Sequence, residues 1–365
     1  MTSVRADRLE ALVCEAELDA VIVGDLVRPG DSGPDASADI RWLTGFTGTS
    51  GLALVGPDRR EFMTDFRYVE RAASEVFEGF ERRILEGRLL REVARRLEGR
   101  VGFDDETTSV ASLRKLTEEL ADGVELVSVR GLLTRLRRRK DADEIDRIAE
   151  ASRLADEVFE WIAETGLTGR TERNVATAAE ARMRELGAEP AFPMIVAGGP
   201  NGAQPHAEPG SREIEPGELV VVDMGARLDG YCSDGTRTFA SGEPGDDARE
   251  IYELVLRSQQ QSLDAIRPGI SGADADAVSR EVITEAGHGD HYGHGLGHGV
   301  GLEVHEAPRL GKTSEDVLEA GDVVTVEPGI YLSGRFGVRI EDLVAIEDSG
   351  YRNLSGTPKT LRIVG

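Results

Sequence analysis

The N-terminal part of the chain alternates short apolar runs with amphipathic stretches. Residues 5–17 have the pattern of an amphipathic helix, and the apolar residues at 19–24 predict a strand directly after it. A polar loop rich in Gly, Pro and Asp occupies residues 25–39. Further strands are predicted at 52–55, 60–64 and 100–103, and further helices near 67–76, 87–98 and 109–121. Alternation of this kind favours an α/β domain.

An arginine-dense segment, residues 132–140, precedes a different pattern. Apolar residues recur at helical spacing after Asp141, and Gly166 ends this helix. A second helix is predicted at 171–186 with Thr171 as its N-cap. The pattern then predicts strands at 192–197, 219–224 and 231–240. It predicts helices at 245–266 and 273–286, and mostly strand and loop after residue 290. A length of 365 residues suits two domains, which we place at 1–135 and 136–365.

Composition narrows the classes of protein. The chain has no apolar stretch long enough to span a bilayer, and its N-terminus is charged, so we expect a cytoplasmic protein without a membrane segment. Cys14 and Cys232 cannot form a disulfide framework, which fits a reducing compartment. A net charge of −25 disfavours binding to nucleic acid or to anionic membranes. Almost all basic residues are arginines, which resembles proteins of salt-accumulating halophiles, although a GC-rich genome would have a similar effect.

Two hairpin patterns carry a carboxylate on each arm. In the first, an apolar run leads into Asp223, residues 228–230 can turn, and Asp234 lies on the returning strand. We expect the two aspartates to face each other. Like charges opposite each other destabilise a sheet, and a buried carboxylate is costly unless it is paired. A bound divalent cation would remove both penalties.

The second hairpin repeats this arrangement with Glu327 and Glu341, which flank a turn at 333–337 symmetrically. Pro328 has no N–H to donate, so we expect regular strand pairing to be interrupted beside Glu327. Four carboxylates with imidazole suit Mn²⁺, Co²⁺, Fe²⁺ or Zn²⁺. They are too many for one catalytic ion, so we expect two ions that share bridging carboxylates.

All six histidines lie in the second domain, at positions 206, 288, 291, 294, 298 and 305. His298, framed by Gly297 and Gly299, is the expected metal ligand. We expect His294 and His305 to reach the cavity as substrate contacts, and the histidines at 288 and 291 to be solvated loop residues. The histidine at 206 lies in a Pro/Gly-rich loop, and its own surroundings do not decide between a surface loop and an active-site loop.

These motifs together resemble the pita-bread metallopeptidase family of aminopeptidase P, prolidase and methionine aminopeptidase. The resemblance rests on VVVDMGARLDGYCSDGTRTF, GHGLGHGVGLEVHE, TVEPGIY and GVRIEDLV. IRWLTGFTGTSGLALV and FMTDFRYVERA are similar to the creatinase-type N-terminal domain of prolidases and aminopeptidases P. The resemblance therefore implies an α/β N-terminal domain followed by an α+β pita-bread catalytic domain. The acidic loop at 25–39 is longer than is usual in the family.

The resemblance implies a set of roles. All five family metal positions are matched: Asp223, Asp234, His298, Glu327 and Glu341, of which Asp234 and Glu341 would bridge two ions, with Mn²⁺ the expected metal. The ions would activate a hydroxide that attacks the peptide bond between an N-terminal residue and proline. Glu327 would also handle protons, and His206 and His305 would position the peptide and stabilise the tetrahedral intermediate. His294 would line the pocket for proline, and Arg339 would join this network unless it only forms a salt bridge to Asp342.

The resemblance leaves several readings open. The expected substrates are proline-containing dipeptides or longer peptides, because Xaa-Pro dipeptidases and aminopeptidases P share every motif used here. We expect a homodimer, because the N-terminal domain that closes the cleft often comes from a partner subunit in this family. The alternatives are a catalytically inactive pita-bread binding module and a metal-free, creatinase-like amidinohydrolase. Retention of all five ligand positions favours the peptidase.

Overall fold

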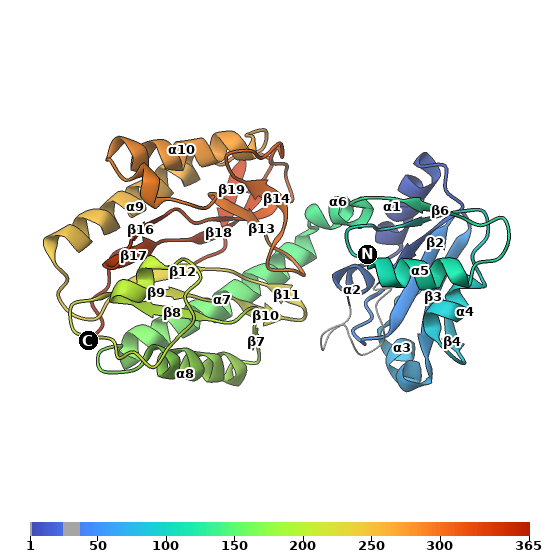
Figure 1. Ribbon diagram of the computed structural model, residues 1–365, viewed down its shortest axis with the longest axis horizontal. Coiled ribbons are helices and arrows are strands. Elements are labelled where there is room, and N and C mark those ends of the chain that lie inside the picture. Colours follow the sequence, from blue (N-terminus) through green and yellow to red (C-terminus); the bar gives the residue numbers. More distant parts are fainter. Residues whose placement is uncertain (1, 25–36) are drawn as a thin grey trace. The chain divides into compact units, whose positions relative to one another are not determined.

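The computed structural model describes residues 2–24 and 37–365 (Figure 1). The chain divides into two compact units, Met1–Arg137 and Arg138–Gly365. The boundary expected at 135–136 falls inside helix α6, Leu132–Arg138. Most of the acidic loop at 25–39 lies outside the described residues. No helix in the described ranges is long and apolar enough to cross a bilayer.

The first unit is built on one mixed six-stranded sheet with the order β4-β3-β2-β1-β5-β6. Helices α4 and α5 pack against the apolar residues of one face of this sheet, including Ile22, Leu54 and Met63, in keeping with the predicted α/β domain. Its helices and strands are α1 (Thr2–Glu15), β1 (Ala20–Val23), α2 (Ala38–Thr44), β2 (Gly51–Gly56), β3 (Arg59–Asp65), η1 (Phe66–Tyr68), α3 (Val69–Glu75), β4 (Glu81–Leu85), α4 (Leu89–Ala94), β5 (Arg100–Phe103), α5 (Val110–Glu118) and β6 (Glu125–Ser128).

Sequence patterns missed the two edge strands of this sheet, β4 and β6. Most side chains of both strands are exposed or half-buried, so neither strand has the apolar run that identifies a buried strand. Their backbones nevertheless pair in parallel with β3 and β5. Whether a strand lies at the edge of a sheet depends on which strands lie beside it in space. The residues of the strand itself do not show this.

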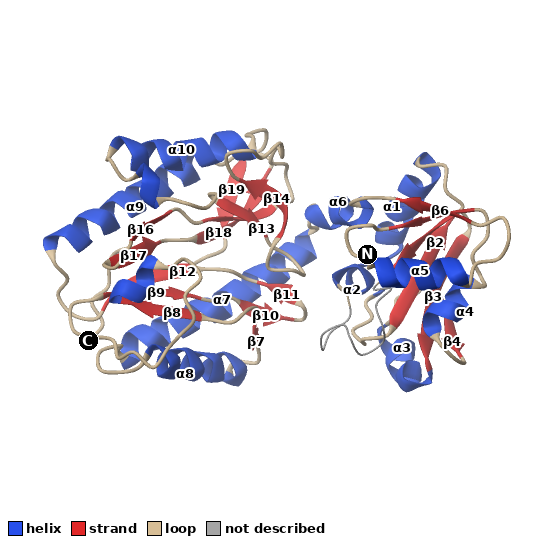
Figure 2. Cartoon of the chain, in the orientation of Figure 1, coloured by secondary structure: helices blue, strands red, loops and turns tan. Residues whose placement is uncertain are grey.

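The second unit places two pairs of helices against antiparallel sheets (Figure 2). Its helices are α7 (Ala142–Thr165), α8 (Glu172–Glu185), α9 (Asp246–Ala265), α10 (Gly272–Glu285) and the short η2 (Gly199–Ala203) and η3 (Gly289–His291). Its strands are β7 (Glu189–Pro190), β8 (Ile195–Gly198), β9 (Leu219–Asp223), β10 (Ala226–Leu228), β11 (Tyr231–Cys232), β12 (Thr236–Ala240), β13 (Gly297–Gly299), β14 (Glu306–Leu310), β15 (Val323–Val326), β16 (Gly329–Leu332), β17 (Phe336–Arg339), β18 (Asp342–Glu347) and β19 (Gly350–Asn353).

Local capping signals fix the helices of this unit. Asp141 and Glu144 form a capping box at the start of α7, and Gly166, with φ 77°, ends the helix. The Thr171 side chain accepts a hydrogen bond from the Asn174 N–H, so it caps α8 as expected. The apolar faces of α7 and α8 pack against β8 and β9 in one core, while α9 and α10 contribute to the cores beneath β13–β18.

The first carboxylate hairpin has a different register from the expected one. Asp229 and Gly230 both have positive φ, 48° and 82°, and form a two-residue turn that pairs β10 with β11. Continued along the strands, this register places Asp223 opposite Thr236 rather than opposite Asp234. The expectation centred the turn one residue too early, which shifts the facing partner by two positions.

The second hairpin has the expected symmetry. Gly329 pairs with Arg339 in β16–β17, and Val326 pairs with Asp342 in β15–β18. Both pairings have the same register. Glu327 and Glu341 lie between these two paired stretches and are therefore opposite each other. Pro328 lacks an N–H, which accounts for the break in the ladder at this point.

Candidate metal centre

Three carboxylates meet where the two hairpins converge. Asp223 is the last residue of β9, Asp234 lies between β11 and β12, and Glu341 lies between β17 and β18. One oxygen from each of them can lie within 4.8 Å of the others. Asp234 and Glu341 are buried, with exposed fractions of 7% and 2%. Strand pairing thus gathers acids from two distant hairpins into one buried cluster.

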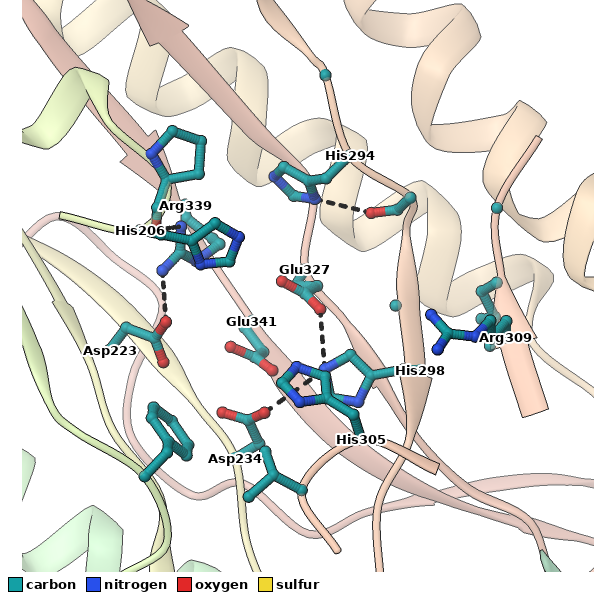
Figure 3. Close-up of a pocket in the computed structure, with 18 of the residues that line it drawn as sticks. His206, Asp223, Asp234, His294, His298, His305, Arg309, Glu327, Arg339 and Glu341 are labelled. Carbon is teal, nitrogen blue, oxygen red and sulfur yellow. Dashed lines mark hydrogen bonds and ion pairs between the residues drawn. The ribbon is translucent and has the colours of Figure 1, made fainter. Parts of the chain in front are cut away.

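His298 and Glu327 complete the group on its other side. The His298 N–H donates to Thr325 Oγ1, and its Nδ1 lies 3.1 Å from the Gly299 carbonyl. These contacts direct Nε2 toward Glu327 Oε1, at 3.4 Å, and Asp234 Oδ2, at 3.6 Å. A methyl group at Gly297 would lie 2.1 Å from the Thr325 carbonyl, so only glycine permits this approach. Figure 3 shows all five expected ligands facing one space.

The electrostatics of the cluster suit a cation. Burial and the neighbouring carboxylates raise the pKa of Asp234 and Glu341 well above their ordinary values. Burial also acts to raise the pKa of Glu327, but the hydrogen bond and charge of His298 outweigh it and hold this pKa at about 2. Among the described residues, Asp223 Oδ1 and Glu341 Oε1 are buried and accept no hydrogen bond. Two buried oxygens of this kind, in a set of carboxylate and imidazole donors, fit divalent metal ions.

Arg339 holds one side of the cluster in place. Its guanidinium donates to Asp223 Oδ2 at 2.5 Å, to the Tyr331 hydroxyl at 2.8 Å and to Thr236 Oγ1 at 3.0 Å. Thr236 in turn donates to Glu341 Oε2 at 2.7 Å. The alternative of a simple salt bridge between Arg339 and Asp342 is therefore wrong. Arg339 leaves the second oxygen of Asp223 unpaired and directed toward the cluster.

The remaining expected histidines line the same cavity, which has a volume of about 1090 Å³. His294 is held at both nitrogens, because Nδ1 lies 2.8 Å from the Gly295 carbonyl and Nε2 lies 2.8 Å from the Tyr331 hydroxyl. Burial lowers the pKa of His294, which favours the neutral ring. The His305 ring lies 4.3 Å from the His298 ring, measured between centroids. His206 is exposed and faces the cavity from the opposite wall (Figure 3).

Some functional neighbours escaped the sequence patterns. Tyr331 and Thr236 connect Arg339 to His294 and Glu341, but neither residue type signals a metal site by itself. Tyr331 lies in the motif TVEPGIY and Thr236 in the motif SDGTRTF. Their closeness in sequence to the expected ligands is the only signal that could have identified them. The two remaining histidines, at positions 288 and 291, lie in or beside η3 and are not among the residues that line this cavity.

A cavity with four carboxylates and one imidazole at its base defines a metal-dependent hydrolase. Residues 146–348 match metallopeptidase family M24, and residues 5–139 match the creatinase/prolidase N-terminal domain. The chain belongs to metallopeptidase family M24. This confirms the expected fold, and it confirms that the protein uses divalent metal ions.

Similar proteins span the whole chain. An uncharacterized peptidase of Bacillus subtilis is 41% identical over 336 residues, 90% of this chain and 94% of the relative. The structure of an Xaa-Pro dipeptidase from Bacillus anthracis superposes with a TM-score of 0.94 at 38% identity and covers 100% of both chains. An X-Pro aminopeptidase from Thermotoga maritima has a TM-score of 0.89 at 32% identity and covers 99% of this chain and 100% of its own.

Proposed function

We propose that this protein hydrolyses the peptide bond between an N-terminal residue and proline with the help of two divalent metal ions, for which Mn²⁺ is the expected metal. The observation that carries the proposal is the convergence of five ligand side chains on one cavity, with two buried carboxylate oxygens that accept no hydrogen bond from the described residues. Similarity to an Xaa-Pro dipeptidase and an X-Pro aminopeptidase supports the choice of substrate.

In this proposal Asp223, Asp234, His298, Glu327 and Glu341 hold the ions. Asp234 and Glu341 would be the two ligands shared between the ions, as the family resemblance implies, and both are buried in the cluster. When bound, such ions lower the pKa of water and polarise the scissile carbonyl. Glu327 is the proton-handling carboxylate, since it lines the cavity and its Oε1 lies 3.4 Å from His298 Nε2.

The residues around the cluster position the peptide. His206 and His305 both line the cavity, where they can contact the reacting carbonyl and stabilise the charge that develops on its oxygen. His294 lines the pocket for proline, and its contact with Tyr331 fixes the ring. Arg339 contacts Asp223 and Tyr331 together, so it links the ligand group to the substrate pocket.

The experiment that tests this function compares Xaa-Pro with Xaa-Pro-Yaa at high salt, with Mn²⁺ and with excess chelator. We expect hydrolysis with Mn²⁺ or Co²⁺ and none in chelator. Cleavage of the dipeptide alone assigns a dipeptidase, and cleavage of the longer peptide assigns an aminopeptidase. Full activity in excess chelator would refute the metal mechanism. Absence of bound metal in the purified protein would instead favour an inactive binding module or an amidinohydrolase.

We further propose that the protein forms a homodimer. We also propose that it is located in the cytoplasm and that the cell accumulates salt. The charge of −25 and the scarcity of lysine support the salt-rich setting, because strong self-repulsion is screened when the Debye length falls to about 3 Å near 1 M salt. Sedimentation at high and low salt tests the dimer, and a monomer under both conditions would refute it.

A further inference from the structure

The segment that carries His206, residues 199–210, has little regular structure of its own. It begins as the short helix η2 and continues without helix or strand to Gly210. His206 is exposed, and so are its neighbours Gln204 and Glu208. Because the His206 side chain is itself exposed, apolar packing around that side chain does not hold it in place. Whatever places His206 must therefore act on the backbone of the segment.

One buried carboxylate contacts both ends of this segment. Glu172 has an exposed fraction of 0%. Its Oε1 accepts hydrogen bonds from the Gly198 N–H, at 2.9 Å, and from Asn201 Nδ2, at 3.0 Å. Its Oε2 accepts from Asn201 Nδ2 at 3.0 Å and from the Gly210 N–H at 3.1 Å. The entry and the exit of the segment are thus held by the same side chain.

The backbone beside Glu172 strengthens the exit contact. The Arg173 N–H donates to the Gly210 carbonyl at 3.0 Å, and the Glu172 N–H donates to the Arg212 carbonyl at 3.1 Å. The Arg212 guanidinium forms its ion pair with Glu218. The Glu172 carboxylate therefore accepts hydrogen bonds from the backbone N–H groups of Gly198 and Gly210 and from the side-chain amide of Asn201.

The position of Glu172 in helix α8 does not by itself explain its burial. Thr171 already caps the helix, and an exposed carboxylate in the first turn would gain the same favourable interaction with the helix dipole. Taking a carboxylate out of water is costly unless hydrogen bonds compensate for it. Here the compensating hydrogen bonds come from residues 198–210. The Glu172 carboxylate can therefore stay buried only while that segment keeps its position.

The middle of the segment has a separate contact with the site. The Pro205 carbonyl accepts a hydrogen bond from Arg339 Nη1 at 3.3 Å. Arg339 also holds Asp223, so the residue directly before His206 is tied to the ligand group. Together the contacts fix the segment at its two ends through Glu172 and at its centre through Arg339.

We propose that Glu172 is a positioning residue that sets the place of His206 over the cavity. This inference rests on the proposed role of His206 in peptide hydrolysis. Glu172 does not line the cavity itself, so it acts through the backbone of residues 199–210. Loss of its contacts should displace His206 while the metal ligands stay in place.

The central test is Glu172→Gln, which keeps the shape of the side chain but turns an NH₂ group toward N–H donors. We expect kcat to fall by up to about 100-fold, because a misplacement of about 1 Å can cost this much, with a smaller change in KM. Bound metal per chain should not change. Amide hydrogen exchange in residues 199–210 should become faster, which is a readout independent of activity.

The matched control is Glu144→Gln. Glu144 is also a buried carboxylate in the first turn of a helix, but it contacts Tyr231 and the N-cap of α7. It should leave exchange in residues 199–210 and kcat close to the wild-type values. If Glu172→Gln folds poorly, Asn201→Ala removes only the amide contact and should produce a smaller change in the same direction.

A double-mutant cycle shows whether Glu172 acts through His206. We expect Glu172→Gln to cause no further loss of kcat in a His206→Ala background, because the residue that it positions is already absent. Additive losses, or full activity of His206→Ala, would overturn the inference. Unchanged exchange in residues 199–210 would also overturn it. Absence of Xaa-Pro hydrolysis in the wild type would refute the proposed function instead, and the exchange comparison would still decide the positioning role.

Discussion

Asp342 provides a sharp test of how the second unit supports its site. It directly follows Glu341, is 1% exposed, and its Oδ1 lies 2.9 Å from Arg237 Nη2. Its Oδ2 accepts from Lys359 Nζ at 2.5 Å, from Asn353 Nδ2 at 3.0 Å and from Gln259 Nε2 at 3.2 Å. Asp342→Asn would remove the charge and leave these donors around a neutral group.

The size of the effect follows from the burial of Arg237. Its exposed fraction is 3%, so the guanidinium cannot turn to solvent when its anion is lost. Removing one partner of a buried ion pair costs about 3–5 kcal/mol. We take the lower value, because the Asn carbonyl still accepts one of the hydrogen bonds. A loss of about 3 kcal/mol corresponds to a fall in Tm of about 6–12 °C for a unit of this size.

The assay is differential scanning calorimetry in excess chelator, so that metal binding contributes equally little to both proteins. Lys359→Met is the matched control, because Lys359 is 21% exposed and Asp342 keeps its bond to Arg237. We expect this control to lose only about 1 kcal/mol. The reasoning would be refuted if Asp342→Asn unfolded at the wild-type temperature, or if the control were destabilised equally.

Three further predictions concern the metal ligands, a close backbone contact and the surface charge. Asp234→Ala and Glu341→Ala should each lower the Mn²⁺ content per chain measured by elemental analysis, and unchanged content would contradict the bridging roles. Gly225→Ala should destabilise the second unit by about 1–3 kcal/mol in urea, because the new methyl group would lie 2.0 Å from the Ser233 carbonyl. Gly293→Ala is the control without crowding, because nothing lies within 4 Å of the added methyl group and its φ is not in the left-handed region. Raising KCl from low to molar concentration should raise Tm, and no change would contradict the proposed salt adaptation.

Local signals account for the parts of the fold that were predicted well. The capping box at Asp141, the stop at Gly166 and the cap at Thr171 act within a few residues, so helices α7 and α8 were placed nearly to their ends. The edge strands β4 and β6 have no such signal. Their pairing depends on a neighbouring strand rather than on apolar residues of their own.

The same distinction separates the ligand residues from their supports. A carboxylate at the end of an apolar strand is a visible anomaly, and for this reason Asp223 and Glu327 stood out. Thr236, Tyr331 and Glu172 are ordinary in their local sequence. Each of them makes a contact with a residue at least 26 positions away: Glu172 with Gly198, Tyr331 with His294 and Thr236 with Glu341.

The sequence by itself determined the two-domain organisation, most of the longer helices and buried strands, and the identity of the residues suited to bind metal. These properties depend on spacing along the chain and on side-chain chemistry. Only the tertiary structure decided that Asp223 faces Thr236 rather than Asp234, that Arg339 binds Asp223 rather than Asp342, and that a single buried carboxylate holds both ends of the His206 segment. Such choices depend on the residue at which a turn closes and on which strands meet, since a shift of one residue in the centre of a turn changes every partner that follows.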